Sequence, residues 1–196
     1  MARSAKLQVC LGFDGSITDD WTVLRAETID GFQFTPQQLD GRPTIWDPAD
    51  YGGGIPRLAV QAAVDHAMST FDVARMYCDP WFWASEVDDW ALKYGDEVVI
   101  AWPTNRVPQM HAALERFVTD LTTGRLTHDG CETTARHMAN ARKLLKTGDR
   151  YIIGKPQGAH HQKIDAAVTS VLAHEAACDA LADGWKPRKS SRMVVW

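Results

Sequence analysis

Two short strand-like segments in the sequence, the first of them an apolar run, are each followed by an aspartate, and this pattern constrains the fold more than any other feature. The run LQVCLGF, from Leu7 to Phe13, is followed by Asp14 in a D-G-S turn, which is typical of a buried strand. The run from Thr70 to Cys78 ends at Asp79, and the proline that follows restricts this aspartate to extended geometry. The sequence therefore predicts two core strands that each carry a carboxylate at the end.

The remaining pattern predicts an α/β protein whose sheet opens as an antiparallel meander. Further strands are expected at 21–29 and 31–39, separated by Asp-Gly turns. The strand–helix–strand order over 70–102 implies a parallel pair. We therefore predict a central mixed sheet flanked by helices, with one domain over 1–184 and a tail over 185–196. Helices are expected at 55–69, 81–94, 105–123, 132–140 and 161–182, a loop at 43–54, and extended segments at 97–102 and 151–155.

Composition excludes several classes of protein. Hydrophobic residues make up 45% of the chain, as in globular proteins. No run approaches the roughly 18 apolar residues of a membrane span, and the N-terminal MARSAK lacks the apolar core of a signal peptide. We expect a soluble intracellular protein. The four cysteines are widely spaced without a C-x-x-C pair, which predicts buried reduced thiols rather than a zinc ribbon or redox motif: Cys10, Cys78, Cys131 and Cys178.

The net charge of −4 argues against a protein whose whole surface grips nucleic acid. A cluster of metal-binding carboxylates would itself contribute negative charge, and a local basic strip is compatible with phosphate binding. The basic residues of that strip are Arg136, Arg142, Lys143, Lys146, Arg150 and Lys155.

A third aspartate, Asp165, differs from the two at strand ends because it lies in the apolar stretch KIDAA on the last expected helix. An unpaired buried carboxylate is costly, so this position requires a partner cation. Two Mg²⁺ or Mn²⁺ ions held by a few carboxylates can activate a water and stabilise the leaving oxygen in phosphodiester cleavage. Any one of these aspartates taken alone has a simpler explanation, since Asp is common at turns.

Three segments of the sequence resemble the C-terminal nuclease domain of the large terminase subunit of tailed bacteriophages. They are LGFDGS at 11–16, MYCDP at 76–80 and HHQKIDAAVTSVLAHEAA at 160–177. That family has an RNase H-like fold, related to RuvC-type resolvases, with catalytic aspartates on its first strand, at the end of its fourth strand and on its last helix. The resemblance, which extends to about Gly184, implies that Asp14, Asp79 and Asp165 are the catalytic metal ligands.

The same resemblance implies a metal-dependent endonuclease that cleaves concatemeric double-stranded viral DNA during genome packaging. Its expected cofactors are two Mg²⁺ or Mn²⁺ ions. Its expected partners are DNA, the terminase ATPase domain, the small terminase subunit and the portal, in the host cytoplasm, with the isolated chain a monomer. No G-x-x-x-x-G-K-[ST] phosphate loop is present, so we expect no ATPase activity. An excised domain and a naturally separate nuclease are both compatible with this sequence.

Several polar residues near the three aspartates are candidates for contacts with DNA. Lys163, His160 and His161 precede or begin the last expected helix, where they can reach a phosphate, although polar residues are common at helix starts. Asn140 is a further DNA-contact candidate, and helix capping is an equally good explanation for it.

Two further groups near these segments have competing interpretations. Ser16, Asp19 and Asp20 follow the first aspartate and are either an auxiliary ligand set or, as we favour, solvated turn residues. The closely spaced tryptophans, Trp81, Trp83 and Trp90, are interpreted as core aromatics rather than base-stacking platforms.

Two other functions remain open from the sequence. A RuvC-like junction resolvase would share the fold and the carboxylates but would be an obligate dimer that prefers branched DNA. A catalytically inactive RNase H-like domain would only bind DNA or protein, and the presence of all three aspartates argues against it.

Overall fold

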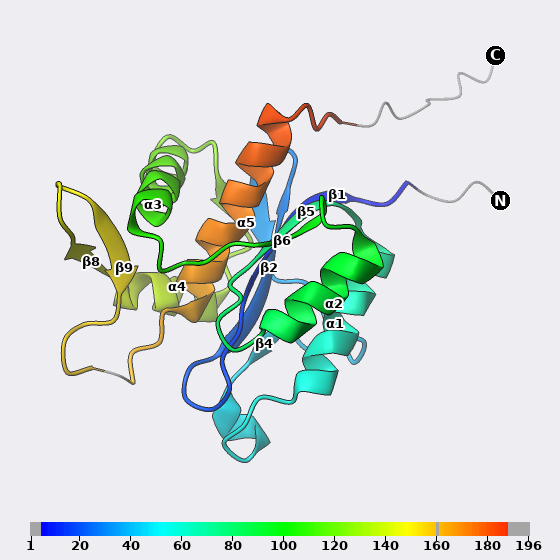
Figure 1. Cartoon of the computed structure of the whole chain (residues 1–196), viewed down its shortest axis with the longest axis horizontal. Helices are drawn as coiled ribbons and strands as arrows, with labels where there is room; N and C mark the ends of the chain where they lie inside the picture. The colour runs from blue at the N-terminus through cyan, green and yellow to red at the C-terminus, as the bar shows by residue number, and fades with distance from the viewer. Residues whose placement is uncertain (1–4, 160, 188–196) are drawn as a thin grey trace.

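The computed structural model describes residues 5–159 and 161–187, and its centre is a mixed β-sheet (Figure 1). The strands of this sheet lie in the order β6-β5-β1-β2-β3-β7, with β4 paired to β2. A central mixed sheet was predicted from the sequence, and this prediction is confirmed. Its strands are β1 (Gln8–Asp14), β2 (Thr22–Thr28), β3 (Phe32–Phe34), β4 (Ile45–Trp46), β5 (Asp72–Cys78), β6 (Val99–Ala101) and β7 (Thr127–His128).

Strand β1 lies at the centre of the sheet because it is apolar on both faces. It pairs antiparallel with β2 and parallel with β5, and β6 then adds parallel to β5. The predicted antiparallel opening and the predicted parallel strand–helix–strand unit are both confirmed. Since β1 and β5 are parallel neighbours, their C-terminal ends meet at one edge of the sheet.

Helices cover both faces of the sheet (Figure 1). On one face α1 (Arg57–Thr70) and α2 (Ala84–Tyr94) close a core that contains Phe13, Leu24 and Trp90. On the other face α3 (Val107–Thr122) and α5 (Asp165–Ala182) close a second core, and α4 (Glu132–Asn140) packs against α5.

Helix α5 runs directly across the middle of the sheet, where it packs on β1, β2 and β5. The approach is closest at Gly12 of β1. A Cβ atom built there would lie 2.4 Å from the backbone oxygen of Thr169 and 2.5 Å from the backbone nitrogen of Ala173. The absence of a side chain at Gly12 therefore lets the backbone of α5 lie on the strand.

The structure corrects the expected boundaries in several places. The last helix begins at Asp165, four residues later than expected, so this aspartate starts the helix rather than lying inside it. The expected loop over 43–54 contains β4 and a 3-10 helix, Pro48–Tyr51. The strand expected over 31–39 shortens to β3. Strand β8 (Arg142–Leu145), which was not predicted, pairs with β9 (Tyr151–Gly154) in a hairpin.

The cysteines and tryptophans follow the predictions only in part. All four cysteines are free, but only Cys10 and Cys78 are buried, whereas Cys131 and Cys178 are half-buried. Trp83 and Trp90 are core residues, whereas Trp81 is 63% exposed, because a turn rather than a helix spans it. Among the helices of the described ranges, none is both long and apolar enough to cross a bilayer.

Candidate functional site

The parallel pairing of β1 and β5 places two of the predicted aspartates side by side. Asp14 is the last residue of β1, and Asp79 directly follows β5. The register pairs Phe13 with Cys78, and the backbone N–H of Asp79 donates to the carbonyl of Phe13 across 3.0 Å. The two carboxylates therefore extend from adjacent positions at one edge of the sheet.

The third predicted aspartate reaches the same edge from above the sheet. Asp165 is the first residue of α5 and is only 6% exposed. It lines a pocket of about 270 Å³ together with Asp14 and Asp79. The structure thus brings together three carboxylates that are far apart in the sequence. The pocket is lined by Asp14, Gly15, Ser16, Asp20, Trp21, Asp79, Pro80, Trp81, Phe82, Pro103, Thr104, Asn105 and Asp165.

The electrostatics of the pocket favour a bound cation. Burial, followed by the neighbouring charges of Asp165 and Asp79, raises the pKa of Asp14 well above its usual range. Burial and the charge of Asp20 raise the pKa of Asp165 to about 6. Within the described part of the chain, Oδ2 of Asp165 is buried and has no hydrogen-bond partner. Buried carboxylates with this much mutual repulsion and an unsatisfied oxygen fit a site for divalent cations.

The orientation of Asp79 is set by two hydrogen bonds. The backbone N–H of Trp81 donates to Oδ1 across 3.2 Å, and the hydroxyl of Thr104 donates to Oδ2. Thr104 follows β6, the parallel neighbour of β5, so it belongs to the same edge of the sheet. This edge location is the sequence signal that could have identified Thr104.

A fourth carboxylate, Asp20, also lines the pocket. Lys155 contacts its Oδ1, and Nζ of Lys163 lies 3.0 Å from the same atom. Burial alone raises the pKa of Asp20, but the hydrogen bonds from the two lysines outweigh it and lower the pKa. Asp20 is therefore paired with two lysines, although its side chain is still 38% exposed, whereas Asp19 has a side chain that is 78% exposed, as expected for a solvated turn residue.

The predicted DNA-contact residues have different environments. Lys163 is bound to Asp19 and Asp20. Asn140 donates from Nδ2 to the backbone carbonyl of Lys163 across 2.9 Å, so it ties the end of α4 to the segment before α5. His161 is exposed, and His160 lies outside the described residues.

Three of these residues, Asn140, His161 and Lys163, line a groove beside the acidic pocket. The groove has a volume of about 820 Å³, and the guanidinium of Arg136 lies 5.6 Å from the centre of the Trp21 ring at its side. Trp21 lines both the groove and the acidic pocket, so the two are adjacent. The groove is lined by Asp19, Trp21, Asp47, Arg136, His137, Asn140, His161, Gln162 and Lys163.

Comparison with known sequences finds two phage proteins. The chain is 36% identical over 198 residues to the Gene 13 protein of Mycobacterium phage D29 and 34% identical over 198 residues to that of Mycobacterium phage L5. Each alignment covers 96% of this chain and 32% of the relative, so the chain spans about a third of the length of these relatives. No model of a protein family matches the chain.

Comparison with solved structures identifies the fold. The large terminase nuclease of the thermophilic phage G20c superposes with a TM-score of 0.65 at 12% identity, over 86% of this chain and 82% of that one. That nuclease has also been solved with bound magnesium and with bound cobalt. The HK97 bacteriophage large terminase superposes with a TM-score of 0.64 at 16% identity, over 90% of this chain and 40% of that one. The chain therefore has the fold of the large terminase nucleases, and the predicted fold is confirmed.

Proposed function

We propose that this chain is the nuclease domain of a phage large terminase and cleaves double-stranded DNA by metal-dependent hydrolysis of phosphodiester bonds. One observation carries the proposal. Carboxylates from the end of β1, the end of β5 and the start of α5 converge in one pocket on the fold of the large terminase nucleases. We assign Asp14, Asp79 and Asp165 as the catalytic metal ligands.

The cofactors in this proposal are two Mg²⁺ or Mn²⁺ ions. Such ions, when bound by oxygen ligands, activate the attacking water and stabilise the leaving oxygen. The residues of this chain supply the negative charge and the fixed geometry. The pKa of Asp165, raised to about 6, and its unpartnered Oδ2 support this assignment. A cation stabilises the ionised carboxylate and gives this oxygen a partner. Thr104 and the N–H of Trp81 hold Asp79 in place as a ligand.

The substrate in this proposal reaches the pocket along the adjacent groove. Arg136 and His161, which line this groove, contact the phosphate backbone in this proposal. Lys163, already bound to two carboxylates, and Asn140, bound to a carbonyl, act by shaping the groove. His160, predicted from the sequence, remains a candidate. The β8–β9 hairpin and its flanks supply further positive charge from Arg142, Lys143, Lys146 and Arg150, whereas Lys155 is paired with Asp20.

The biological setting is part of the same proposal. The chain would cut concatemeric viral DNA in the host cytoplasm during packaging and would be a monomer in isolation. Its partners would be a terminase ATPase domain, the small terminase subunit and the portal. The relatives from phages D29 and L5, which are about three times as long as the aligned segment, have room for such a further domain.

Cleavage of supercoiled plasmid tests the proposal. The purified chain should nick and linearise the plasmid with Mg²⁺ or Mn²⁺ but not with EDTA, and Asp14→Ala, Asp79→Ala and Asp165→Ala should each abolish cleavage. Asp50→Ala, which changes an exposed aspartate on the 3-10 helix, is the matched control and should cut normally. Preference for a four-way junction would instead indicate a resolvase. DNA binding without cleavage, in either metal, would indicate an inactive binding domain.

A further inference from the structure

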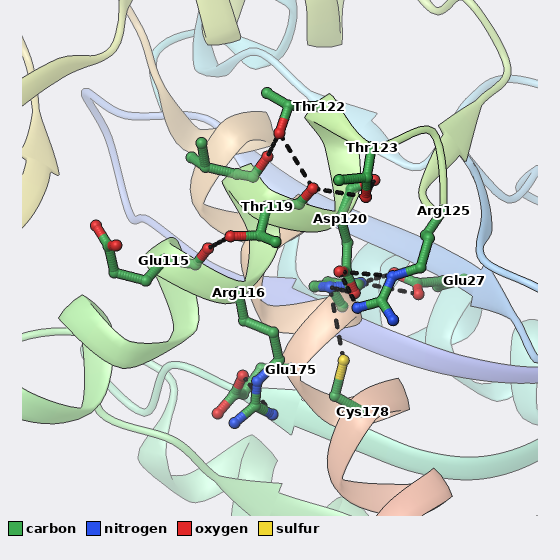
Figure 2. Close-up of polar contacts among 12 residues, drawn as sticks. Glu27, Glu115, Arg116, Thr119, Asp120, Thr122, Thr123, Arg125, Glu175 and Cys178 are labelled. Atoms are coloured by element: carbon green, nitrogen blue, oxygen red, sulfur yellow. Dashed lines mark hydrogen bonds and ion pairs between the residues drawn. The ribbon is translucent and has the colours of Figure 1, made fainter.

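A second cluster of metal-ligating side chains lies on α5, away from the acidic pocket. His174 and Cys178 are one turn apart on this helix, and Asp120 approaches them from α3 (Figure 2). The three candidate ligand atoms lie within 4.8 Å of one another. His174 follows Asp165 by nine positions, which corresponds to roughly 13 Å along the helix at 1.5 Å per residue. The cluster is therefore separate from the catalytic carboxylates.

The spacing within this cluster matches the coordination sphere of one tetrahedral ion. Nε2 of His174 lies 3.3 Å from Oδ2 of Asp120 and 3.5 Å from Sγ of Cys178. Zinc bonds of about 2.0–2.1 Å to nitrogen or oxygen and about 2.3 Å to sulfur place tetrahedral ligand atoms roughly 3.3–3.6 Å apart. The two distances from Nε2 of His174 therefore match this spacing, and the distance between Asp120 and Cys178, which is within 4.8 Å, requires at most about 1.5 Å of closure to match it.

The side of His174 opposite the ligand atoms is braced by a carboxylate. Nδ1 of His174 lies 3.0 Å from Oε1 of Glu27 on β2. Gln33 in turn donates to Oε2 of Glu27 across 2.9 Å and to the carbonyl of Ser170 across 2.8 Å. Despite burial, the contacts with Cys178 and Glu27 raise the pKa of His174 to about 10, so an ion at Nε2 takes the place of a proton there. In the neutral tautomer whose Nδ1 proton is directed at Glu27, the lone pair of Nε2 faces Asp120 and Cys178. This carboxylate–histidine arrangement is the usual support for a metal-bound histidine.

The carboxylate of Asp120 is also held in position. Nε of Arg125 donates to Oδ1 across 2.9 Å (Figure 2), and the other oxygen, Oδ2, lies 3.3 Å from Nε2 of His174. Asp120 and His174 are buried, whereas Cys178 is half-buried, so solvent can supply a fourth ligand. The carboxylate of Asp120 and a thiolate at Cys178 each supply one negative charge to the ion, and the charges of Glu27 and Arg125 lie on the far sides of His174 and Asp120. A set of one oxygen, one nitrogen and one sulfur suits zinc or cobalt, whereas magnesium and calcium take oxygen ligands.

We propose that Asp120, His174 and Cys178 bind one zinc-class divalent ion, with water as the fourth ligand. The ion joins the C-terminal end of α3 to the middle of α5. Because α5 begins at Asp165, this ion also fixes the helix that carries one of the carboxylates of the acidic pocket. The site rests on its own geometry and is independent of the proposed nuclease activity.

Cobalt spectroscopy tests the site without any activity assay. The whole chain, stripped with EDTA and dialysed, is titrated with Co²⁺. Binding at Cys178 produces a thiolate-to-cobalt charge-transfer band in the near ultraviolet, which an all-oxygen site cannot give. The band should saturate at one equivalent, disappear on addition of Zn²⁺, and persist in Asp14→Asn, whose substitution lies in the acidic pocket.

Two cysteine variants decide the result. Cys178→Ser should lose the band, and the control Cys131→Ser, which changes the other half-buried cysteine, should keep it. Zn²⁺ should also raise the melting temperature of Asp14→Asn but not of the double variant Asp14→Asn with Cys178→Ser. No band in the wild type, or an unchanged band in Cys178→Ser, would overturn the proposal. In that case a proton shared by His174, Glu27 and Asp120 holds the cluster together.

Discussion

The backbone N–H of Ala166 donates a hydrogen bond to Nδ1 of His137 across 3.1 Å. His137 lies on α4 and is 1% exposed. Since Nδ1 accepts this bond, the imidazole is neutral. Burial, together with the charges of Arg136 and Lys163, lowers the pKa of His137 to about 4. Helix α4 therefore holds the first turn of α5 one residue beyond Asp165, and this attachment requires a neutral histidine.

Acidification should release this attachment. A histidine whose pKa is lower in the folded than in the unfolded protein contributes stability that is present above about pH 6.5 and is lost as the pH falls towards about 4. The wild type should therefore lose on the order of 1–3 kcal/mol from this group between pH 7 and pH 4. Urea denaturation in steps of pH measures the loss.

A comparison of two variants isolates His137. His137→Gln keeps an acceptor for the Ala166 N–H but does not titrate, so its stability should fall less steeply below pH 6.5. His161→Gln, which changes an exposed histidine, should follow the wild type. Equal slopes for the wild type and His137→Gln would show that His137 does not control the acid response.

Asp14→Asn should stabilise the metal-free protein. The pKa of Asp14 is raised well above its usual range by burial and by the charges of Asp165 and Asp79, so its ionised form opposes folding at pH 8. Removal of this charge should raise the free energy of unfolding in EDTA by on the order of 1 kcal/mol, a typical size for a single substitution, as measured by denaturant titration.

Addition of metal should make the wild type more stable than Asp14→Asn. Mg²⁺ or Mn²⁺ should stabilise the wild type, because an ion that binds only the folded state adds stability, and should have little effect on Asp14→Asn. Asp88→Asn, on the exposed side of α2, should respond to metal as the wild type does. An Asp14→Asn protein that is less stable than the wild type in EDTA would contradict the inference that repulsion between buried carboxylates destabilises the metal-free pocket.

Gly12→Ala should weaken the contact between β1 and α5. The added Cβ would lie 2.4 Å from a backbone oxygen of α5, and only a shift of the helix can relieve this overlap. We expect a loss of about 1–3 kcal/mol in stability, as for overpacked cores. Plasmid cleavage should fall as well, since the shift moves Asp165 relative to Asp14.

Gly54→Ala is the matched control for this helix contact. A Cβ atom at Gly54 would meet nothing within 4 Å, so thermal melting and cleavage should stay close to those of the wild type. If Gly12→Ala were as stable and as active as Gly54→Ala, the close approach of α5 to β1 would have no role in positioning Asp165.

The sheet edge with its carboxylates was predictable because it depends on local signals. An apolar run that ends at Asp14 and a strand-like segment that ends at Asp79 indicate strand ends by themselves, and the intervening helix makes the strands parallel. Asp165 was identifiable for a similar reason, since a carboxylate among alanines needs a cation. The resemblance to terminase nucleases, which have aspartates on two strands and then on the last helix, then predicted that these three aspartates form one metal site.

The features that were missed depend on contacts between distant segments. The pairing of Lys155 and Lys163 with Asp20 joins residues more than 130 positions apart, and no local pattern indicates it. Strand β8 has four exposed residues, so it lacks the alternation that identifies a strand. The only local signal for the Asp120 cluster was the spacing of His174 and Cys178, which puts both on one side of a helix.

Asp20 provides the sharpest test of the acidic pocket, because its neighbour Asp19 is a natural control. Both carboxylates bind Lys163, but only Asp20 lines the pocket. We expect Asp20→Ala to raise the Mg²⁺ or Mn²⁺ concentration needed for half-maximal cleavage by roughly 10-fold, as is typical for residues that support a metal site. Asp19→Ala should change it little.

The physical reason is that Asp20 supplies negative charge to the pocket and binds Lys155. Loss of its carboxylate lowers the attraction for cations and frees a lysine that then repels them, so both effects weaken metal binding. Asp20→Asn, which keeps the size of the side chain but not its charge, separates charge from packing and should resemble Asp20→Ala. If Asp19→Ala and Asp20→Ala had the same metal dependence, Asp20 would serve only to hold Lys163, and the metal site would consist of Asp14, Asp79 and Asp165 alone.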